Sequence, residues 1–201
     1  MIAPIEVPLG GKRGVTVCGD EGVYATTSDG LARLAPVLPG GTVTYGAQTH
    51  PADGNAGLVV AGRDRARALG RDGVEVRVLS YAEARARPGF MPQAGVPAAR
   101  RALADAGLAV RDVAAIQTHN PFAVNDVYFS RELGVPLDAM NPFGSSLVWG
   151  HPQAPTGLRS LVELIEALAL RGGGNGLFTG CSAGDCAAAL VVRVSGGRTD
   201  R

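Results

Sequence analysis

Three side chains with acid, base or nucleophile chemistry lie where apolar runs give way to turns. His119 ends the run "VAAIQTH", His151 stands in "GSSLVWGHPQAP" ahead of a long apolar stretch, and Cys181 begins a turn between the last two apolar runs. Loops held by rigid elements commonly carry catalytic groups. The cysteine could be a nucleophile activated by histidine, or an acid and base that moves a proton for another nucleophile. The residue types alone leave both chemistries open, together with a structural role for each side chain.

The elements that must position these side chains alternate between strands and helices. Apolar runs and period-two alternation predict strands over residues 56–62, 74–84 and 113–119, and two neighbouring strands within 175–194. Helical periodicity, with proline near starts and glycine near ends, predicts helices over residues 63–70, 96–107, 122–134 and 156–173. The sequence therefore predicts an α/β fold with a mixed five-stranded sheet and helices on both faces.

The first part of the chain has weaker signals. The sequence predicts two extended pieces, residues 2–7 and 14–18, around a Gly/Lys/Arg turn, and a short helix over residues 26–38 preceded by a Thr or Ser cap. At the other end, we expect residues 196–201 to be a frayed tail. The helix that begins at Thr156 is apolar over most of its circumference, so it must be covered on several sides.

Composition excludes several classes of function. The formal net charge is +1 and the arginines are scattered, so we expect neither a nucleic-acid nor a membrane partner. The chain has no leader-like apolar region and no run of about 18 apolar residues, which favours a cytoplasmic protein. Three cysteines without paired spacing predict reduced thiols and no metal site.

Four segments resemble the thiolase family, in the family's order and spacing. "MNPFGSSLVWGHPQAPTG" is similar to the segment in which an Asn-Pro pair and a Gly-Gly-Ala run lead into Gly-His-Pro, and "GLFTGCSAGDCAAALVV" to the closing Cys-x-Gly motif and last strand. "THNPF" stands where thiolases carry Asn-Glu-Ala-Phe or, in the sterol-carrier type, His-Asp-Cys-Phe. "TVTYGAQTHPADGNAGLVV" matches a fourth segment without a gap. The resemblance is to the sterol-carrier-type and acetyl-CoA acetyltransferase group.

The resemblance implies a role for each candidate residue. His151 corresponds to the imidazole that activates the nucleophilic thiol and helps to hold an oxyanion. Cys181 corresponds to the second cysteine, which protonates or deprotonates the α-carbon of the acyl group. His119 corresponds to the residue that completes the oxyanion hole with His151, and Thr49 falls at a serine that contacts the pantetheine arm of coenzyme A.

The same resemblance implies that the chain is a half. Residue 1 corresponds to a point beyond the middle of a thiolase, so residues 1–41 are expected to be a loop-domain remnant, residues 42–195 a C-terminal thiolase-like domain, and residues 196–201 a tail. Neither Cys18 nor Cys186 matches the family's acyl-accepting cysteine. We therefore expect the C-terminal-half subunit of a split thiolase-type acyltransferase. It would act on acyl-CoA without a permanently bound cofactor, and it would be inactive until a separately encoded N-terminal half covers the long helix in a hetero-oligomer.

Some positions depart from the family pattern. Ser182 and Ala183 follow Cys181 where the family has glycine, "GSS" replaces Gly-Gly-Ala, Asn120 replaces an acidic residue, and Trp149 is bulkier than the usual neighbour. The departures around Cys181, together with the missing acyl-accepting cysteine, motivate an alternative, a non-catalytic thiolase-like scaffold or acyl-CoA-binding module. A third hypothesis is a stand-alone hydrolase that uses Cys181 with His151.

Overall fold

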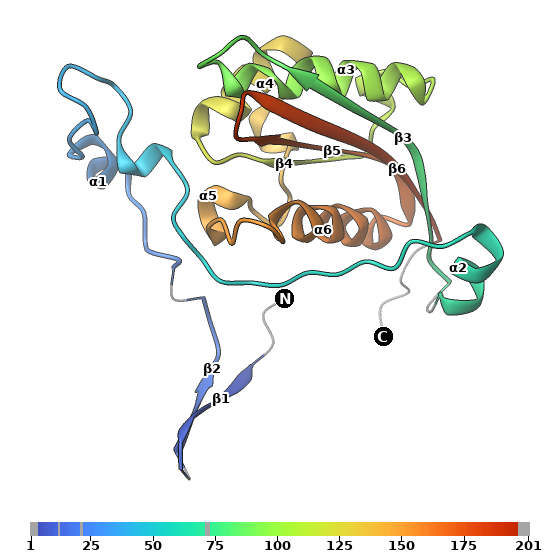
Figure 1. Ribbon diagram of the computed structural model, residues 1–201, viewed down its shortest axis with the longest axis horizontal. Coiled ribbons are helices and arrows are strands. Elements are labelled where there is room, and N and C mark those ends of the chain that lie inside the picture. Colours follow the sequence, from blue (N-terminus) through green and yellow to red (C-terminus); the bar gives the residue numbers. More distant parts are fainter. Residues whose placement is uncertain (1–3, 12, 21, 71–72, 197–201) are drawn as a thin grey trace.

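The main sheet brings the last four strands together. The computed structural model describes residues 4–11, 13–20, 22–70 and 73–196. Its larger sheet has the order β3-β6-β5-β4, formed by β3 (Glu75–Arg85), β4 (Ala115–His119), β5 (Gly173–Ser182) and β6 (Cys186–Ser195) (Figure 1). Strand β4 runs parallel to β5, whereas β6 is antiparallel to both β5 and β3. The predicted mixed sheet is confirmed, and the carboxyl ends of β4 and β5 meet at one edge.

Helices cover both faces of this sheet, as predicted. Helices α3 (Gly95–Asp105) and α4 (Ala123–Leu133) lie on one side and α6 (Thr156–Leu170) lies on the other (Figure 1). Small side chains let α3 approach the sheet, since Ala98, Ala99 and Ala102 are fully buried. Leu164 and Leu168 of α6 are also fully buried and belong to a second apolar cluster on the opposite face. The sheet is therefore packed on both sides.

Shorter elements connect these layers. They are the helices α2 (Arg63–Leu69) and α5 (Ser146–Trp149) and the single 3-10 turns η1 (Tyr45–Ala47), η2 (Met91–Gln93), η3 (Val110–Asp112) and η4 (Leu137–Ala139). Helix α5 begins at a Ser145 cap, whose hydroxyl accepts a hydrogen bond from the backbone N–H of Leu147 at 3.3 Å. This cap shapes the loop that leads to His151.

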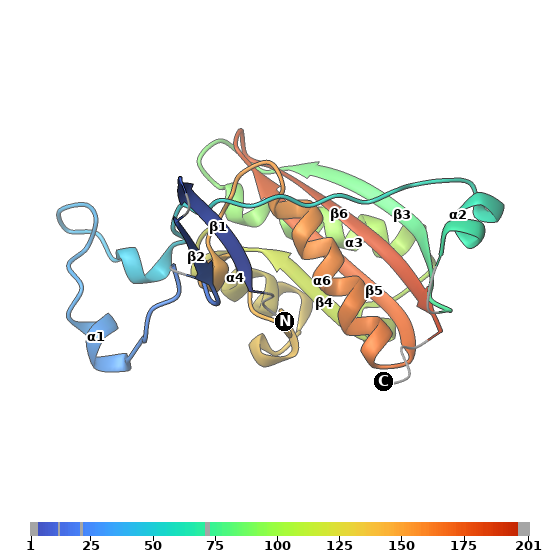
Figure 2. The same ribbon diagram turned by 90° about the horizontal axis from the view of Figure 1, so that it is seen from below.

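The N-terminal elements lie apart from the main sheet (Figures 1 and 2). Strands β1 (Ile5–Gly10) and β2 (Arg13–Val17) pair as an antiparallel hairpin, and α1 (Ser28–Ala32) follows. Thr27 caps this helix by accepting a hydrogen bond from the Gly30 backbone N–H at 3.1 Å. The two predicted extended pieces and the capped short helix are therefore confirmed within the described residues, and residues 2 and 3 of the first piece lie outside them. The predicted tail lies outside the described residues, except for Gly196.

The predicted strand over residues 56–62 is wrong, and the main sheet has four strands, not five. This segment is extended but pairs with no strand among the described residues, and it runs along the outer side of α6 (Figures 1 and 2). The apolar side chains of Val59 and Val60 are 83% and 85% exposed. A strand needs a neighbouring backbone to complete its hydrogen bonds. The apolar run indicated a tendency toward burial, but this chain provides no adjacent strand.

Helix α6 also keeps one apolar side uncovered. Leu158, Val162 and Leu170 recur at intervals of four and eight residues, so they share one side of the helix, and each is at least 41% exposed. The sheet covers only the opposite side. Among the helices of the described residues, none combines the length and apolar character that crossing a bilayer requires.

Candidate active site

Two of the predicted site residues come together because their strands are parallel neighbours. His119 ends β4 and pairs in register with Gly180 of β5, which places Cys181 one residue farther along the same edge. A Cβ atom at Gly180 would lie 3.3 Å from the Cβ atom of His119 and 3.0 Å from the ring of Phe178. Glycine at this position therefore lets the histidine backbone and the aromatic ring approach β5 closely.

His151 reaches the same edge from the loop ahead of α6. Gly150 adopts a φ of +76°, and a Cβ atom there would come within 2.7 Å of Ala52. The following backbone N–H, that of His151, donates a hydrogen bond to the carbonyl oxygen of His50 at 2.8 Å. Left-handed backbone and close approach both favour glycine. The Gly-His pair thus fixes the loop against residues 50–52 and directs the imidazole toward the sheet edge.

The two imidazoles form a pair whose ring centroids are 4.4 Å apart. A hydroxyl holds Nδ1 of each ring, that of Ser146 at 2.8 Å from His119 and that of Thr156 at 2.7 Å from His151. Within the described residues, neither Nε2 atom has a hydrogen-bond partner. Because Nδ1 of each ring is anchored, each Nε2 can serve a ligand as a donor or a base.

Burial keeps both histidines neutral near pH 7. For His119, burial is the largest cause that lowers the pKa, to about 4, and the adjacent His151 and Arg159 lower it further. Burial and then Arg159 also lower the pKa of His151. Two imidazoles so close together would repel each other if both were charged. A neutral pair carries two N–H donors and retains one basic nitrogen on each ring.

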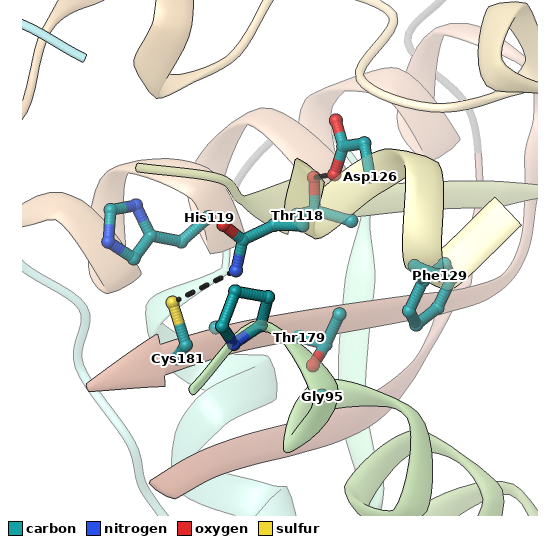
Figure 3. Close-up of a pocket in the computed structure, with 10 residues that line it drawn as sticks. Gly95, Thr118, His119, Asp126, Phe129, Thr179 and Cys181 are labelled. Atoms are coloured by element: carbon teal, nitrogen blue, oxygen red, sulfur yellow. Dashed lines mark hydrogen bonds between the residues drawn. The ribbon is translucent and has the colours of Figure 1, made fainter. Parts of the chain in front are cut away.

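The thiol of Cys181 is a poor nucleophile in this environment. Burial raises its pKa to about 11, an effect that a hydrogen bond from Asn125 partly offsets. This bond, from Asn125 Nδ2 to Cys181 Sγ, spans 3.4 Å (Figure 3). No imidazole hydrogen-bonds to the sulfur among the described residues. A thiol that stays protonated at neutral pH suits proton transfer better than nucleophilic attack, which argues against the stand-alone hydrolase.

His119, His151 and Cys181 line one pocket of about 420 Å³. Gly157, Phe178, Ser182 and five other residues complete its lining. Thr49 does not line this pocket. Its hydroxyl donates to the carbonyl oxygen of Ser146, and its backbone N–H donates to that of Pro121 at 2.8 Å. The structure thus brings three of the four predicted site residues together and places Thr49 behind them, tying two loops of the site.

Comparison with known proteins identifies the family of this chain. The family profile described as "Thiolase, C-terminal domain" matches residues 73–194.

The chain belongs to the thiolase family.

Its relatives include 3-ketoacyl-CoA thiolase B, peroxisomal, of Mus musculus, which is 38% identical over 168 residues that cover 81% of this chain and 39% of the relative. An acetyl-CoA acetyltransferase of Syntrophomonas wolfei is 33% identical over 192 residues, covering 94% and 48%. The crystal structure of the Bacillus anthracis acetyl-CoA acetyltransferase superposes with a TM-score of 0.86 at 29% identity, covering 96% of this chain and 49% of that one. This thiolase-family chain therefore spans less than half the length of these relatives.

Sequence reasoning missed a half-buried carboxylate in this thiolase-family site. Asp126 accepts hydrogen bonds from the Thr118 hydroxyl at 2.7 Å, from Asn141 Nδ2 at 3.0 Å and from Asn120 Nδ2. Burial raises the pKa of Asp126, and these three hydrogen bonds lower it. The cluster joins the end of β4, the start of α4 and the loop after η4, so it fixes the backbone around His119. The signal in the sequence was the Asn-Asp pair one turn after "HNPF".

Ala183, which stands at the glycine position of the family's Cys-x-Gly motif, does not strain the backbone. Among the described residues, the non-glycine positions with positive φ are Asn141, Gln153 and Asp185. Ala183 is not one of them, so alanine fits this thiolase-family turn without a left-handed conformation. The alanine therefore does not by itself argue against a working site.

Proposed function

We propose that this chain is one half of a thiolase-type acyltransferase that cleaves or forms 3-oxoacyl-CoA. In this proposal a second polypeptide, a thiolase N-terminal half, supplies the acyl-accepting cysteine, and coenzyme A and acyl-CoA are substrates. The observation that carries the proposal is the convergence of His119, His151 and Cys181 on one pocket, with the two rings 4.4 Å apart.

Each of the three residues has chemistry that the thiolase reaction requires. In thiolysis, His151 takes the proton from the partner's thiol, and the thiolate attacks the 3-oxo carbonyl carbon. The bond between the α- and β-carbons breaks, which leaves an acyl thioester on the partner and an enolate of acetyl-CoA. Cys181 then gives its proton to the enolate carbon. It recovers a proton from the incoming coenzyme A thiol, whose sulfur attacks the acyl thioester and displaces the partner's thiolate. His151 then returns its proton to that thiolate.

The imidazole pair supports the charge that develops in these steps. An enolate oxygen needs fixed donors, and such donors contribute several kcal/mol when water is excluded. Neutral His119, and His151 once it holds the thiol proton, are suitable donors through Nε2, because a hydroxyl anchors Nδ1 of each ring. The high pKa of Cys181 supports its role as the acid, because the thiol holds its proton until a carbanion forms beside it.

The uncovered side of α6 supports the proposed partner. A groove of about 680 Å³ lies between this side and residues 53–55, and it is lined by apolar and charged side chains that include Trp149, Val162 and Arg159. Nη2 of Arg159 is buried and has no hydrogen-bond partner in the part of the chain that the structure describes. A second thiolase half seated here would cover Leu158 and Val162 and offer an acceptor to the arginine. The exposed apolar residues 58–60 could then add a strand to the sheet of that half.

The test is reconstitution with a thiolase N-terminal half. We expect the purified chain alone to show no coenzyme A-dependent loss of acetoacetyl-CoA, and the co-expressed complex to show it. His151→Ala should abolish turnover by the complex without preventing assembly, measured by size-exclusion chromatography. Arg101→Ala is a matched control, because Arg101 is an exposed residue of α3 whose side chain pairs with Asp105 on the same helix. Turnover by the isolated chain, or by the complex that carries His151→Ala, would refute the proposal.

The alternative is a non-catalytic scaffold or acyl-CoA-binding module, which the lack of a match for the acyl-accepting cysteine in this chain favours. Isothermal titration calorimetry with coenzyme A distinguishes the two functions. Binding that survives the double substitution of His119 and Cys181 by alanine, with no turnover in any mixture of halves, would support the module.

A further inference from the structure

Asn125 contacts the sulfur of Cys181 from a side that the reaction pocket does not reach. Its Nδ2 atom lies 3.4 Å from Sγ (Figure 3). Asn125 lines a small cavity of about 20 Å³ together with Thr118, Phe129 and Cys181, whereas it does not line the larger pocket that holds both imidazoles. The side chain is 8% exposed. It therefore acts on the sulfur without touching a substrate in the pocket.

The orientation of the Asn125 amide is fixed. Its Oδ1 atom accepts a hydrogen bond from the backbone N–H of Phe122 at 3.3 Å, and its own backbone N–H donates to the Phe122 carbonyl oxygen at 3.0 Å. The N–H of Phe122 would otherwise be one of the unpaired donors at the start of α4. Because Oδ1 is held there, the NH₂ group points toward Cys181.

A fixed donor beside a buried thiol favours the charged form of the sulfur. Burial alone disfavours the thiolate, and a hydrogen bond to the thiolate opposes that effect. The sulfur has no cation as a hydrogen-bond partner among the described residues, and the carboxylate of Asp126 disfavours the thiolate. The amide is thus the side-chain group that makes proton release from Cys181 easier.

We infer that Asn125 is a positioning residue for Cys181: its Nδ2–H group holds the sulfur in place and stabilises the thiolate that forms when the proton leaves. The catalytic consequence rests on the proposed thiolase function, in which Cys181 gives and recovers a proton. The effect on the thiol itself does not depend on that function, so it can be measured on this chain alone.

The experiment compares two substitutions. Asn125→Ala removes the donor, and Asn125→Asp keeps an acceptor for the Phe122 N–H while it places a negative charge beside the sulfur. Val124→Ala, on the exposed side of the same turn, is the matched control. All variants carry Cys18→Ser and Cys186→Ser, so that iodoacetamide alkylation and the ultraviolet absorbance of the thiolate report only Cys181. Circular dichroism checks folding.

We expect the titration of the thiol to move to higher pH in both variants, farther in Asn125→Asp. A rise of about one pKa unit leaves about tenfold less thiolate, but each thiolate is about threefold more nucleophilic. Alkylation of Asn125→Ala at pH 9 should then be about threefold slower than in the control, and alkylation of Asn125→Asp slower still. An unchanged titration in folded variants, or faster alkylation, would overturn the inference, since the amide would then only fill space or cover the sulfur.

The outcomes separate this inference from the proposed function. If reconstituted complexes never turn over acetoacetyl-CoA while the thiol titration shifts, the proposed function fails and the role of Asn125 stands. If the complex is active, Asn125→Ala should lower kcat about threefold or more with little change in KM for coenzyme A. An active complex with an unshifted titration would refute Asn125 as a positioning residue.

Discussion

Acid should destabilise this protein through His119, and substitution of that residue should remove the effect. Burial and the neighbouring His151 lower the pKa of His119 from 6.5 to about 4. At pH 5 the unfolded chain therefore binds a proton at this residue and the folded chain does not. The contribution of His119 to the free energy of unfolding is fully present above pH 6.5 and is lost as the pH falls toward 4. The linkage relation gives a loss of about 2 kcal/mol between pH 7 and pH 5.

The assay is urea unfolding at pH 7 and pH 5 for the wild type and for His119→Asn. Asparagine occupies the corresponding position in many thiolases, so the substitution is expected to preserve the fold. Half-buried carboxyls such as Asp126 and Glu163, whose pKa values burial raises, respond to acid equally in both proteins, so their effects cancel in the comparison. The wild type should lose about 2 kcal/mol more than the variant. An equal loss in both would show that His119 titrates normally, and the account of a neutral imidazole pair would be refuted.

Three further predictions follow from named contacts. Asp126→Asn should lower the free energy of unfolding by about 2 kcal/mol in urea, because an amide would face donors that now bind the carboxylate; a stable variant would show that those donors have other acceptors. Leu164→Ala, at a fully buried position, should cost about 3 kcal/mol, whereas Leu158→Ala, at a 41% exposed position, should cost less than about 1 kcal/mol; equal costs in denaturation would contradict the assigned faces of α6. Ser146→Ala should lower kcat of the reconstituted complex about tenfold with KM nearly unchanged, because Nδ1 of His119 loses its partner; full activity would show that the hydroxyl does not orient the ring.

Hydrophobic patterning predicted most of the fold. Strands at residues 74–84 and 113–119, the closing antiparallel pair and the long helix from Thr156 all lie within a few residues of their predicted bounds. Their signals are local, since each depends on the spacing of apolar residues and on glycine or proline at the ends. The prediction of a strand at residues 56–62 was wrong because strand formation is not local. Pairing depends on a neighbouring backbone, which no local pattern encodes.

The site divides in the same way. His119, His151 and Cys181 could be found because their residue types and positions after strands carry chemistry by themselves, and the family resemblance gave each a role. The contacts that support these residues could not be found from the sequence. Ser146, Asn125 and Asp126 gain their importance from distances across the fold, such as the 3.4 Å from an amide in α4 to a sulfur in β5. No spacing along the chain specifies that contact.

Two departures from the thiolase pattern become coherent when their contacts are considered together. Asn120 replaces the acidic residue expected at position 120. A carboxylate still lies beside this position, because Asp126 accepts a hydrogen bond from the side-chain amide of Asn120. Ser146 lies where the family has a small apolar residue, and its hydroxyl is the group that holds Nδ1 of His119. A histidine at position 119 needs such a partner when it is buried, since an unpaired ring nitrogen would cost free energy. The substitutions therefore belong to one arrangement, in which a buried histidine, its hydroxyl partner and a relocated carboxylate fix the edge of the sheet where the reaction would occur.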